Sequence, residues 1–109
     1  MHELMTYIDT DSAEWEPIEP GARRRTLHNN DETGQRILMV QWDPAYTLSY
    51  RDEHHHDEFL FILSGTFVDQ NHSSGAGTYI HNEPGSWHQP NTPDGCTFLA
   101  FISPPRDQQ

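Results

Sequence analysis

From residue 22 onward, short runs of hydrophobic and β-branched residues are separated by sequences that favour turns. Runs of this length bounded by Gly, Pro, Asn and Asp are typical of strands. No long stretch shows the i, i+3, i+4, i+7 apolar spacing of an amphipathic helix. The expected strands cover residues 23–28, 35–42, 45–50, 54–63, 66–69, 77–81, 87–90 and 96–102. Their number and spacing predict an all-β sandwich or barrel.

The chain length of 109 residues predicts one domain with a single core. Residues 1–20 form an acidic lead, which we expect to be an N-terminal arm anchored by Trp15. We assign residues 21–103 to the barrel. Residues 104–109 begin with two prolines and cannot continue a sheet, so we expect them to fray as a C-terminal tail.

Strand alternation places His54, His56 and Glu58 on one face of the expected strand 54–63, above the apolar residues Leu60 and Ile62. Such a row is the geometry of a metal site at the mouth of a barrel cavity. A further histidine returns from a distant part of the chain, because His88 follows a turn of Pro and Gly. The pattern therefore predicts a metal site built from two separate elements.

The opposite face of the same strand carries Phe59, Phe61 and Leu63, so the strand is apolar on both sides. A strand of this kind fits a sheet whose second face is covered by another sheet or by a second subunit. Pairing would also cover exposed strand edges. We therefore expect a homodimer.

The charge balance restricts the possible partners. With 17 acidic and 6 basic residues, the formal net charge is -11, which argues against binding to nucleic acid or to an anionic membrane. A small-molecule ligand or substrate is the expected partner. All six cationic residues are arginine, and the absence of lysine excludes Schiff-base chemistry on a lysine side chain.

Cellular location follows from cysteine content and from the start of the chain. Cys96 is the single cysteine and cannot form an internal disulfide, and Met1-His2-Glu3 has neither the basic nor the apolar region of a signal peptide. The sequence also lacks an apolar run near 18 residues. We expect the protein in the cytoplasm.

The spacing of several residues resembles the two motifs of the cupin superfamily, G(X)5HXH(X)3-4E(X)6G and G(X)5PXG(X)2H(X)3N. Glu58 and Gly65 match the second half of the first motif, and Gly77, Gly85 and His88 keep the spacing of the second. Pro84 and Asn91 each lie one place away from the motif position. The sequence over about residues 15–102 is similar to the cupin domain of ChrR-type anti-sigma factors and their stand-alone relatives. The resemblance implies a small single-domain cupin, a double-stranded β-helix or jelly-roll barrel.

The first motif leaves two ligand sets open, because only Asp57 separates His56 from Glu58, where the family has three or four residues. The metal ligands on a straightened strand would be His54, His56, Glu58 and His88. In the family register without a gap, Asp52 replaces His56. We prefer the first set, since two imidazoles in the row bind first-row metals better than one imidazole with an extra carboxylate.

Mixed histidine and carboxylate ligation suits a divalent transition metal such as Fe, Zn, Mn or Ni. Resemblance to the ketone-cleaving dioxygenases of the superfamily implies an Fe(II)-dependent dioxygenase acting on a small ketone or diketone, with open metal positions for the substrate and dioxygen. Resemblance to ChrR implies instead a non-catalytic zinc-binding sensor or regulatory domain. A third possibility, a metal-free isomerase or sugar-modifying cupin, needs a general base from His88 or Glu58 paired with a tyrosine.

Sigma-factor binding does not follow from the resemblance. In ChrR-type proteins this role belongs to a separate N-terminal zinc domain with its own histidine and cysteine ligands. The acidic lead of this chain contains no cysteine and is too short for such a domain.

Overall fold

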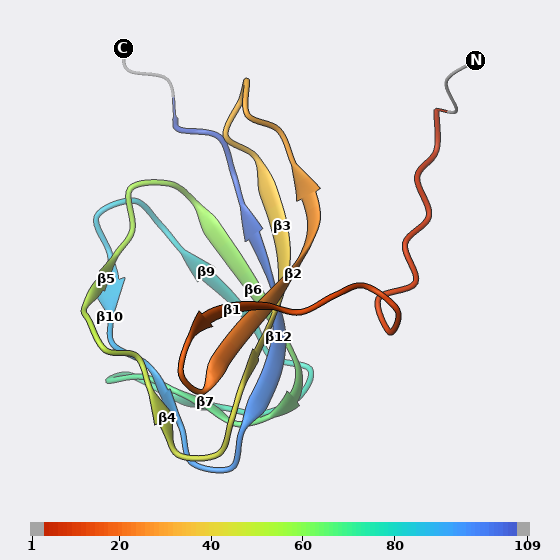
Figure 1. The fold of residues 1–109 in the computed structure, drawn as a ribbon. Helices are drawn as coiled ribbons and strands as arrows, with labels where there is room; N and C mark the ends of the chain where they lie inside the picture. Colours follow the sequence, from red (N-terminus) through yellow and green to blue (C-terminus); the bar gives the residue numbers. More distant parts are fainter. Residues whose placement is uncertain (1–3, 107–109) are drawn as a thin grey trace.

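The computed structural model describes residues 4–106. Over this range the chain forms twelve β-strands in three sheets (Figure 1). The range contains no helix, and so none that could cross a membrane. The prediction of an all-β fold is confirmed.

One layer of the barrel is a six-stranded antiparallel sheet with the order β1-β2-β3-β12-β6-β9. Its longest strands, β2, β3, β6 and β12, are seven or eight residues long. The six strands are β1 (Glu16–Glu19), β2 (Ala22–Asn29), β3 (Arg36–Trp42), β6 (Glu58–Gly65), β9 (Tyr79–Asn82) and β12 (Cys96–Ile102).

The facing layer is made of short strands in two smaller sheets, of order β4-β11-β7-β8 and β10-β5. Figure 1 shows β4, β5, β7 and β10 on the side of the barrel opposite β3, β6 and β12. The short strands are β4 (Tyr46–Thr47), β5 (Asp52–Glu53), β7 (Phe67–Val68), β8 (Ser73–Ser74), β10 (Trp87–His88) and β11 (Asn91–Thr92).

The core lies between the two layers and follows strand alternation. In β3, every second residue from Leu38 to Trp42 is buried, and the cross-strand partners in β12 continue the same face, with Val40 opposite Phe98. Trp42 packs against three further aromatic rings, with Phe67 at a centroid distance of 5.4 Å. Full burial of each large side chain stabilises the fold by about 1.5–3 kcal/mol.

Gly65 ends β6 where the chain approaches another backbone very closely. Its φ is 76°, in the left-handed region that favours glycine. A Cβ at this position would lie 1.9 Å from the carbonyl oxygen of Gly95. The glycine that matches the first cupin motif is therefore required by the contact between β6 and the turn before β12.

The predicted strand 54–63 is wrong in its first part. The chain bends at His55 and His56, and β6 begins only at Glu58. The cause is a change of partner, because the backbone of His54 bonds to Gly85 and Ser86 in one layer, whereas β6 pairs with β9 and β12 in the other. A straight strand cannot join two layers of a barrel.

Residues of both the N-terminal lead and the C-terminal segment contact the barrel. β1 lies within the acidic lead and pairs with β2. At the other end Arg106 forms two hydrogen bonds to Asp57, each of 2.7 Å. The rest of the expected tail, residues 107–109, lies outside the described residues.

Candidate metal centre

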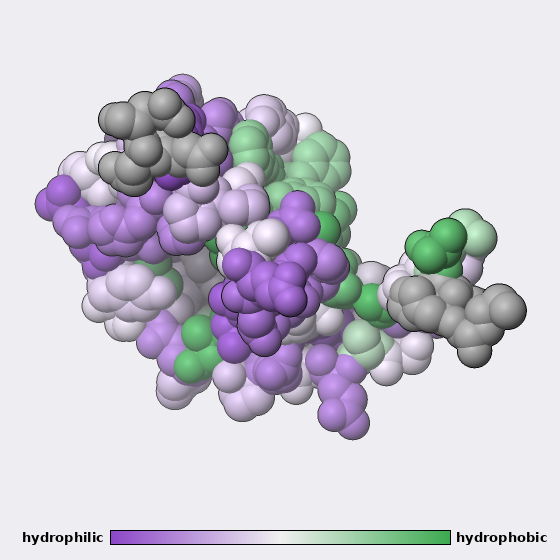
Figure 2. Space-filling view, turned by 90° about the horizontal axis from the view of Figure 1, so that it is seen from above, coloured by the Kyte–Doolittle hydropathy of each residue, from purple (hydrophilic) through white to green (hydrophobic). Residues whose placement is uncertain are grey.

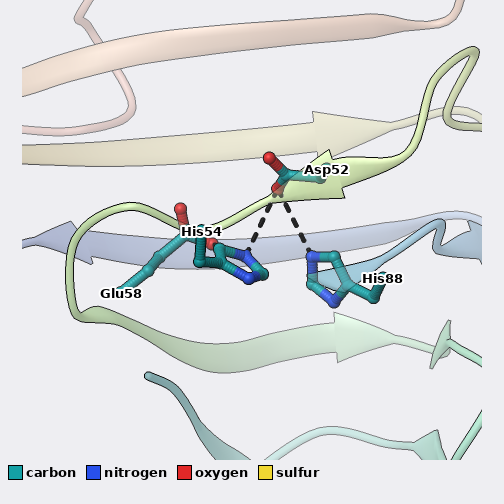
Figure 3. Close-up of side chains that lie close together, drawn as sticks. All are labelled: Asp52, His54, Glu58 and His88. Carbon is teal, nitrogen blue, oxygen red and sulfur yellow. Dashed lines mark ion pairs between the residues drawn. The ribbon is translucent and has the colours of Figure 1, made fainter. Parts of the chain in front are cut away.

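Four side chains converge at one end of the barrel, and the ligand atom that each offers lies within 4.8 Å of the others. The two imidazoles are buried and the two carboxylates are partly buried. Figure 3 shows the carboxylate of Asp52 directed at both imidazole rings. The group consists of Asp52, His54, Glu58 and His88.

Pairing between β5 and β10 brings three of these residues together. Asp52 lies directly opposite His88 in the register of the two strands. His54 is two residues beyond Asp52 and keeps the same face, since its backbone nitrogen donates to the carbonyl oxygen of Ser86 and its own carbonyl accepts from Gly85. The short sheet β10-β5 therefore sets the spacing of one carboxylate and two imidazoles.

Glu58 reaches the group from the opposite layer. It is the first residue of β6 and shares the inner face of that strand with Leu60 and Ile62, which are buried. The bend at residues 55–56 carries the chain across the end of the barrel. The group therefore joins the two layers.

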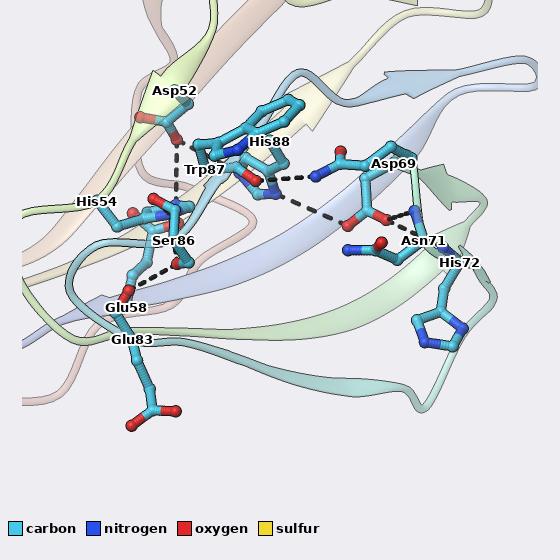
Figure 4. Close-up of polar contacts among 11 residues, drawn as sticks. Asp52, His54, Glu58, Asp69, Asn71, His72, Glu83, Ser86, Trp87 and His88 are labelled. Carbon is cyan, nitrogen blue, oxygen red and sulfur yellow. Dashed lines mark hydrogen bonds and ion pairs between the residues drawn. The ribbon is translucent and has the colours of Figure 1, made fainter.

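Ser86 fixes the orientation of the His54 ring. The Nδ1 atom of His54 lies 3.1 Å from the hydroxyl of Ser86, which in turn donates to the carbonyl oxygen of Glu83 (Figure 4). The Nε2 atom of the ring is buried and has no hydrogen-bond partner among residues 4–106. It points instead toward the carboxylates of Asp52 and Glu58, at 3.4 and 3.6 Å.

The ring of His88 also directs its Nε2 atom at the carboxylate of Asp52. Its Nε2 lies 3.4 Å from Oδ2 of Asp52, and its Nδ1 faces Oδ2 of Asp69 at 3.8 Å (Figure 4). Asp69 is held in place because its other oxygen accepts hydrogen bonds from the backbone of Asn71 and His72. Carboxylate or carbonyl groups behind the far ring nitrogen orient metal-binding histidines in many proteins.

Three separations between ligand atoms of the group match those around a transition-metal ion. Metal–nitrogen and metal–oxygen bonds of about 2.1 Å in a tetrahedral site place neighbouring ligand atoms about 3.4 Å apart. The three closest nitrogen–oxygen separations are 3.4, 3.4 and 3.6 Å. These are too long for good hydrogen bonds and correct for a shared cation. The unpartnered Nε2 of His54 is the atom that such an ion would satisfy.

The electrostatics of the group favour a positive charge at its centre. Burial lowers the pKa of His54, but the contacts with Asp52 and Glu58 outweigh burial and raise it to about 10. The same contacts, from His54 and then from His88, hold the pKa of Asp52 well below its usual range.

A mostly apolar cavity of about 140 Å³ adjoins the group. Its lining includes Asp52, Glu58 and His88, but not His54, and also Tyr50. The remaining walls come mainly from hydrophobic core residues of both layers. The lining contains no arginine. Arg24 lies on the inner face of β2 by its register with Val40 but is not part of the wall.

The structure brings three of the four preferred ligands together, namely His54, Glu58 and His88, and adds Asp52. His56 is not in the group, because the bend turns its ring toward the end of β12, and its Nδ1 lies 3.1 Å from the carbonyl oxygen of Ser103, the residue that follows this strand. The geometric group is therefore the alternative set, in which Asp52 replaces His56. The expected alternation of side chains between the two faces of the strand holds for residues 52–54 and ends at the bend.

Sequence reasoning missed the residues that position the group. Ser86 follows Pro84-Gly85 and Asp69 follows a strand, but neither position distinguishes a positioning residue from an ordinary turn residue. It also missed a cluster behind the bend, in which Asp57 contacts His81 and Arg106, each at 2.7 or 2.8 Å. For these residues, the only signal in the sequence was the run of histidines and carboxylates at residues 54–58, which includes Asp57.

Solved structures show the same fold at low sequence identity. A cupin-like protein of unknown function from Ralstonia eutropha JMP134 superposes with a TM-score of 0.83 at 20% identity, over 94% of this chain and 70% of that one. An acetylacetone dioxygenase from Acinetobacter johnsonii gives a TM-score of 0.82 at 15% identity, over 94% and 76%. These likenesses confirm the cupin fold.

A third structure is the complex of Rhodobacter sphaeroides SigE with the anti-sigma ChrR, with a TM-score of 0.76 and 20% identity. The match covers 87% of this chain but 52% of the other, so this chain spans about half of its length. A search of curated proteins found no match. Residues 3–104 match the ChrR Cupin-like domain. The match extends over nearly the whole sequence, and the chain therefore belongs to the ChrR Cupin-like domain family.

Proposed function

We propose that this protein is a metal-dependent dioxygenase that acts on a small ketone or diketone. Asp52, His54, Glu58 and His88 would hold Fe(II). The observation that carries the proposal is that three members of this group, Asp52, Glu58 and His88, line an otherwise mostly apolar cavity. Bound iron supplies a Lewis acid for a ketone oxygen and electrons for the reaction with dioxygen.

The residues of the chain prepare the cavity for such a reaction. Ser86 and Asp69 keep the Nε2 atoms of both histidines directed at the centre. The apolar walls lower the local dielectric beside the group, which strengthens electrostatic interactions there. Asp52 and Glu58 provide two negative charges next to the space for the substrate.

Cavity size and charge narrow the substrate class. A volume near 140 Å³ accommodates a molecule of about the size of benzene. Two carboxylates and no arginine in the lining disfavour anions such as sugar acids or phosphates. A neutral molecule with adjacent oxygens at one end and a short hydrocarbon body fits both conditions.

The test is metal content combined with oxygen uptake. Protein purified without a histidine tag and reconstituted anaerobically with Fe(II) is expected to bind about one iron per chain and to consume oxygen when acetylacetone is added. His88→Ala should lose both properties, because a ligand is gone. His72→Ala is the matched control, since His72 is an exposed loop residue, and it should retain both.

Two results would contradict the proposal in different ways. If none of Fe(II), Mn(II), Ni(II) and Zn(II) binds to the wild-type protein, the group is not a metal site. If iron binds with the expected dependence on His88 but neither acetylacetone nor other small enolisable ketones cause oxygen uptake, the metal site stands and the dioxygenase activity does not.

The second candidate is a non-catalytic zinc-binding sensor domain of ChrR type. Four potential protein ligands, with three pairwise separations that match tetrahedral coordination, favour this function. Zinc would then stabilise the barrel by joining its two layers. Tightly held zinc, a large rise in the thermal midpoint on zinc binding and no oxygen uptake would support this function over the first.

We place either activity in the cytoplasm. The unpaired Cys96 is buried, and burial raises the pKa of its thiol to about 11, so it remains a protonated core residue. A reducing compartment suits such a chain. Localisation of the tagged protein by cell fractionation tests this placement.

A further inference from the structure

The mostly apolar cavity is exposed to solvent between two of its lining residues. Of the lining residues in the described part of the chain, only Ile18, at 45%, and Tyr50, at 57%, are exposed. Their neighbours in sequence, Glu19 and Ser49, are hydrogen bonded at 2.9 Å, so the two exposed residues lie at the same opening. We call the gap between Ile18 and Tyr50 the cavity mouth.

The two residues of the cavity mouth have polar neighbours. Ile18 is followed by Glu19, and Tyr50 lies between Ser49 and Arg51. Figure 2 shows hydrophilic side chains over much of the body, with hydrophobic surface along one side of it and on the N-terminal segment. Docking of a protein partner uses a larger contiguous apolar patch than two side chains provide. The cavity mouth therefore suits a small molecule.

The two sides of the cavity mouth belong to different layers of the barrel. Ile18 is part of β1, an edge strand that pairs only with β2 and whose register shifts between Pro17 and Glu19. Tyr50 lies between β4 and β5 of the facing layer. In that segment the backbone nitrogen of Leu48 donates to the carbonyl oxygen of Pro90 at 3.0 Å. The width of the mouth therefore depends on what joins β1 to residues 46–50.

Glu19 makes that connection. Its Oε1 accepts a hydrogen bond from the hydroxyl of Tyr46, and its Oε2 accepts one from the hydroxyl of Ser49 at 2.9 Å. These bonds, first from Tyr46 and then from Ser49, lower the pKa of Glu19. Both oxygens of the charged carboxylate are thus acceptors, and hydrogen bonds to a charged group are stronger than those between neutral groups.

We propose that small neutral molecules enter and leave the cavity between Ile18 and Tyr50, and that Glu19 fixes the width of this entrance by holding the two layers together. Glu19 is a positioning residue, since it is not part of the cavity lining. The inference rests on the proposed function only in that the cavity binds a small molecule. It involves neither the metal nor dioxygen.

A residue that controls an entrance has a kinetic signature. It changes the rates of entry and exit by the same factor and leaves the dissociation constant, which is their ratio, unchanged. A residue of the cavity wall changes the dissociation constant instead. Fluorobenzene is a suitable neutral probe, because it is close in size to benzene, which apolar cavities of this volume bind. Its ¹⁹F NMR line shape gives both the dissociation constant and the exit rate.

Glu19→Ala in the full-length protein should raise the exit rate at least about tenfold and change the dissociation constant less than about twofold, because two hydrogen bonds across the mouth are lost. Glu19→Gln should restore much of the wild-type rate, since its amide can still bond both hydroxyls. Ser49→Ala should have a smaller effect of the same kind. Ser73→Ala is the matched control at an exposed serine of β8 and should behave like wild type.

Ile18→Trp tests the route itself, because a larger side chain at the mouth should slow both entry and exit. Circular dichroism confirms that the variants are folded, and Ser49→Ala provides the test if Glu19→Ala does not fold. Three results would overturn the proposal: no binding of fluorobenzene to the wild-type protein, unchanged rates in Ile18→Trp, or latch variants at Glu19 and Ser49 that alter the dissociation constant but not the rates. All of these readouts are independent of oxygen uptake, so loss of the dioxygenase hypothesis leaves the entrance to be judged separately.

Discussion

At the scale of single residues, the bend at His55 and His56 decides which side chains face the candidate metal centre. Asp52 and His54 precede it and remain on the inner face, while the ring of His56 is turned to the carbonyl oxygen of Ser103. Asp52, His54 and His56 each carry a side chain of a type that binds metals. Only their backbone geometry separates a ligand from a neighbour.

Asp52→Ala and His56→Ala form a matched pair for the ligand set. Because Asp52 contacts both imidazoles, its removal should weaken metal binding by at least about a hundredfold, beyond the usual effect of residues that only orient ligands. His56→Ala should keep nearly full affinity. Competition with a chelator of known affinity measures both. The reverse order of effects would establish His56 as the ligand.

At the scale of elements, the contact between β6 and the turn before β12 restricts Gly65. Gly65→Ala should destabilise the metal-free protein by about 2 kcal/mol or more, since the new Cβ meets backbone atoms and the positive φ is strained. Gly75→Ala is the control, because no atom lies within 4 Å of its added Cβ. Chemical denaturation measures both. Equal small effects would mean that the β6 end moves freely.

The cluster of Asp57, His81 and Arg106 holds the end of the chain against the bend. The Arg106 guanidinium and then the His81 ring hold the pKa of Asp57 well below its usual range. A carboxyl whose pKa is lower in the folded than in the unfolded chain stabilises the fold above its unfolded pKa, about 3.9, and loses this contribution as the pH falls toward the folded value.

Arg106→Gln should therefore lower the thermal midpoint of the metal-free protein at pH 7, and the difference from wild type should shrink as the pH falls below about 4. Asp57→Asn should give a similar loss, and the double variant should add little to either. Thermal melts between pH 2.5 and 7, in about unit steps, measure the effect. A difference that is constant with pH would assign the role of Arg106 to packing.

The accuracy of the sequence predictions depended on the element. Alternation located β3 and β12 well, because these central strands bury one face along their whole length. It missed β1, since the sequence Glu-Pro-Ile-Glu lacks a hydrophobic face and owes its structure to pairing with β2. It also continued through residues 54–57, where a change of pairing partner between layers ends the strand. The local alternation of hydrophobic and polar residues contains no information about which strand a segment pairs with.

For the site, sequence predicted the residue types and the convergence of two segments. Histidines and a carboxylate in a row, with His88 returning after a turn, were enough to locate the group. The choice between Asp52 and His56 required the register of β5 with β10, which places Asp52 opposite His88. Pairing across the barrel is a property of the folded chain.

At the scale of the whole molecule, the net charge of -11 opposes association of two copies. Apolar contacts in the expected homodimer would have to overcome this repulsion. Salt screens charges beyond about 10 Å at 0.1 M ionic strength. The dimer should therefore become tighter as sodium chloride is raised from low concentration to about 0.5 M. Sedimentation equilibrium measures the change, and a dimer weakened by salt would indicate that ion pairs hold the copies together.

Trp42 lies in the wall of the cavity, and its ring also stacks on the ring of Phe67. The emission of an indole depends on what surrounds it, so a molecule that enters the cavity changes the fluorescence of this residue directly. Trp15 and Trp87 lie outside the lining and contribute a background that replacement by phenylalanine removes. The protein thus contains its own optical probe of occupancy, one that works without turnover.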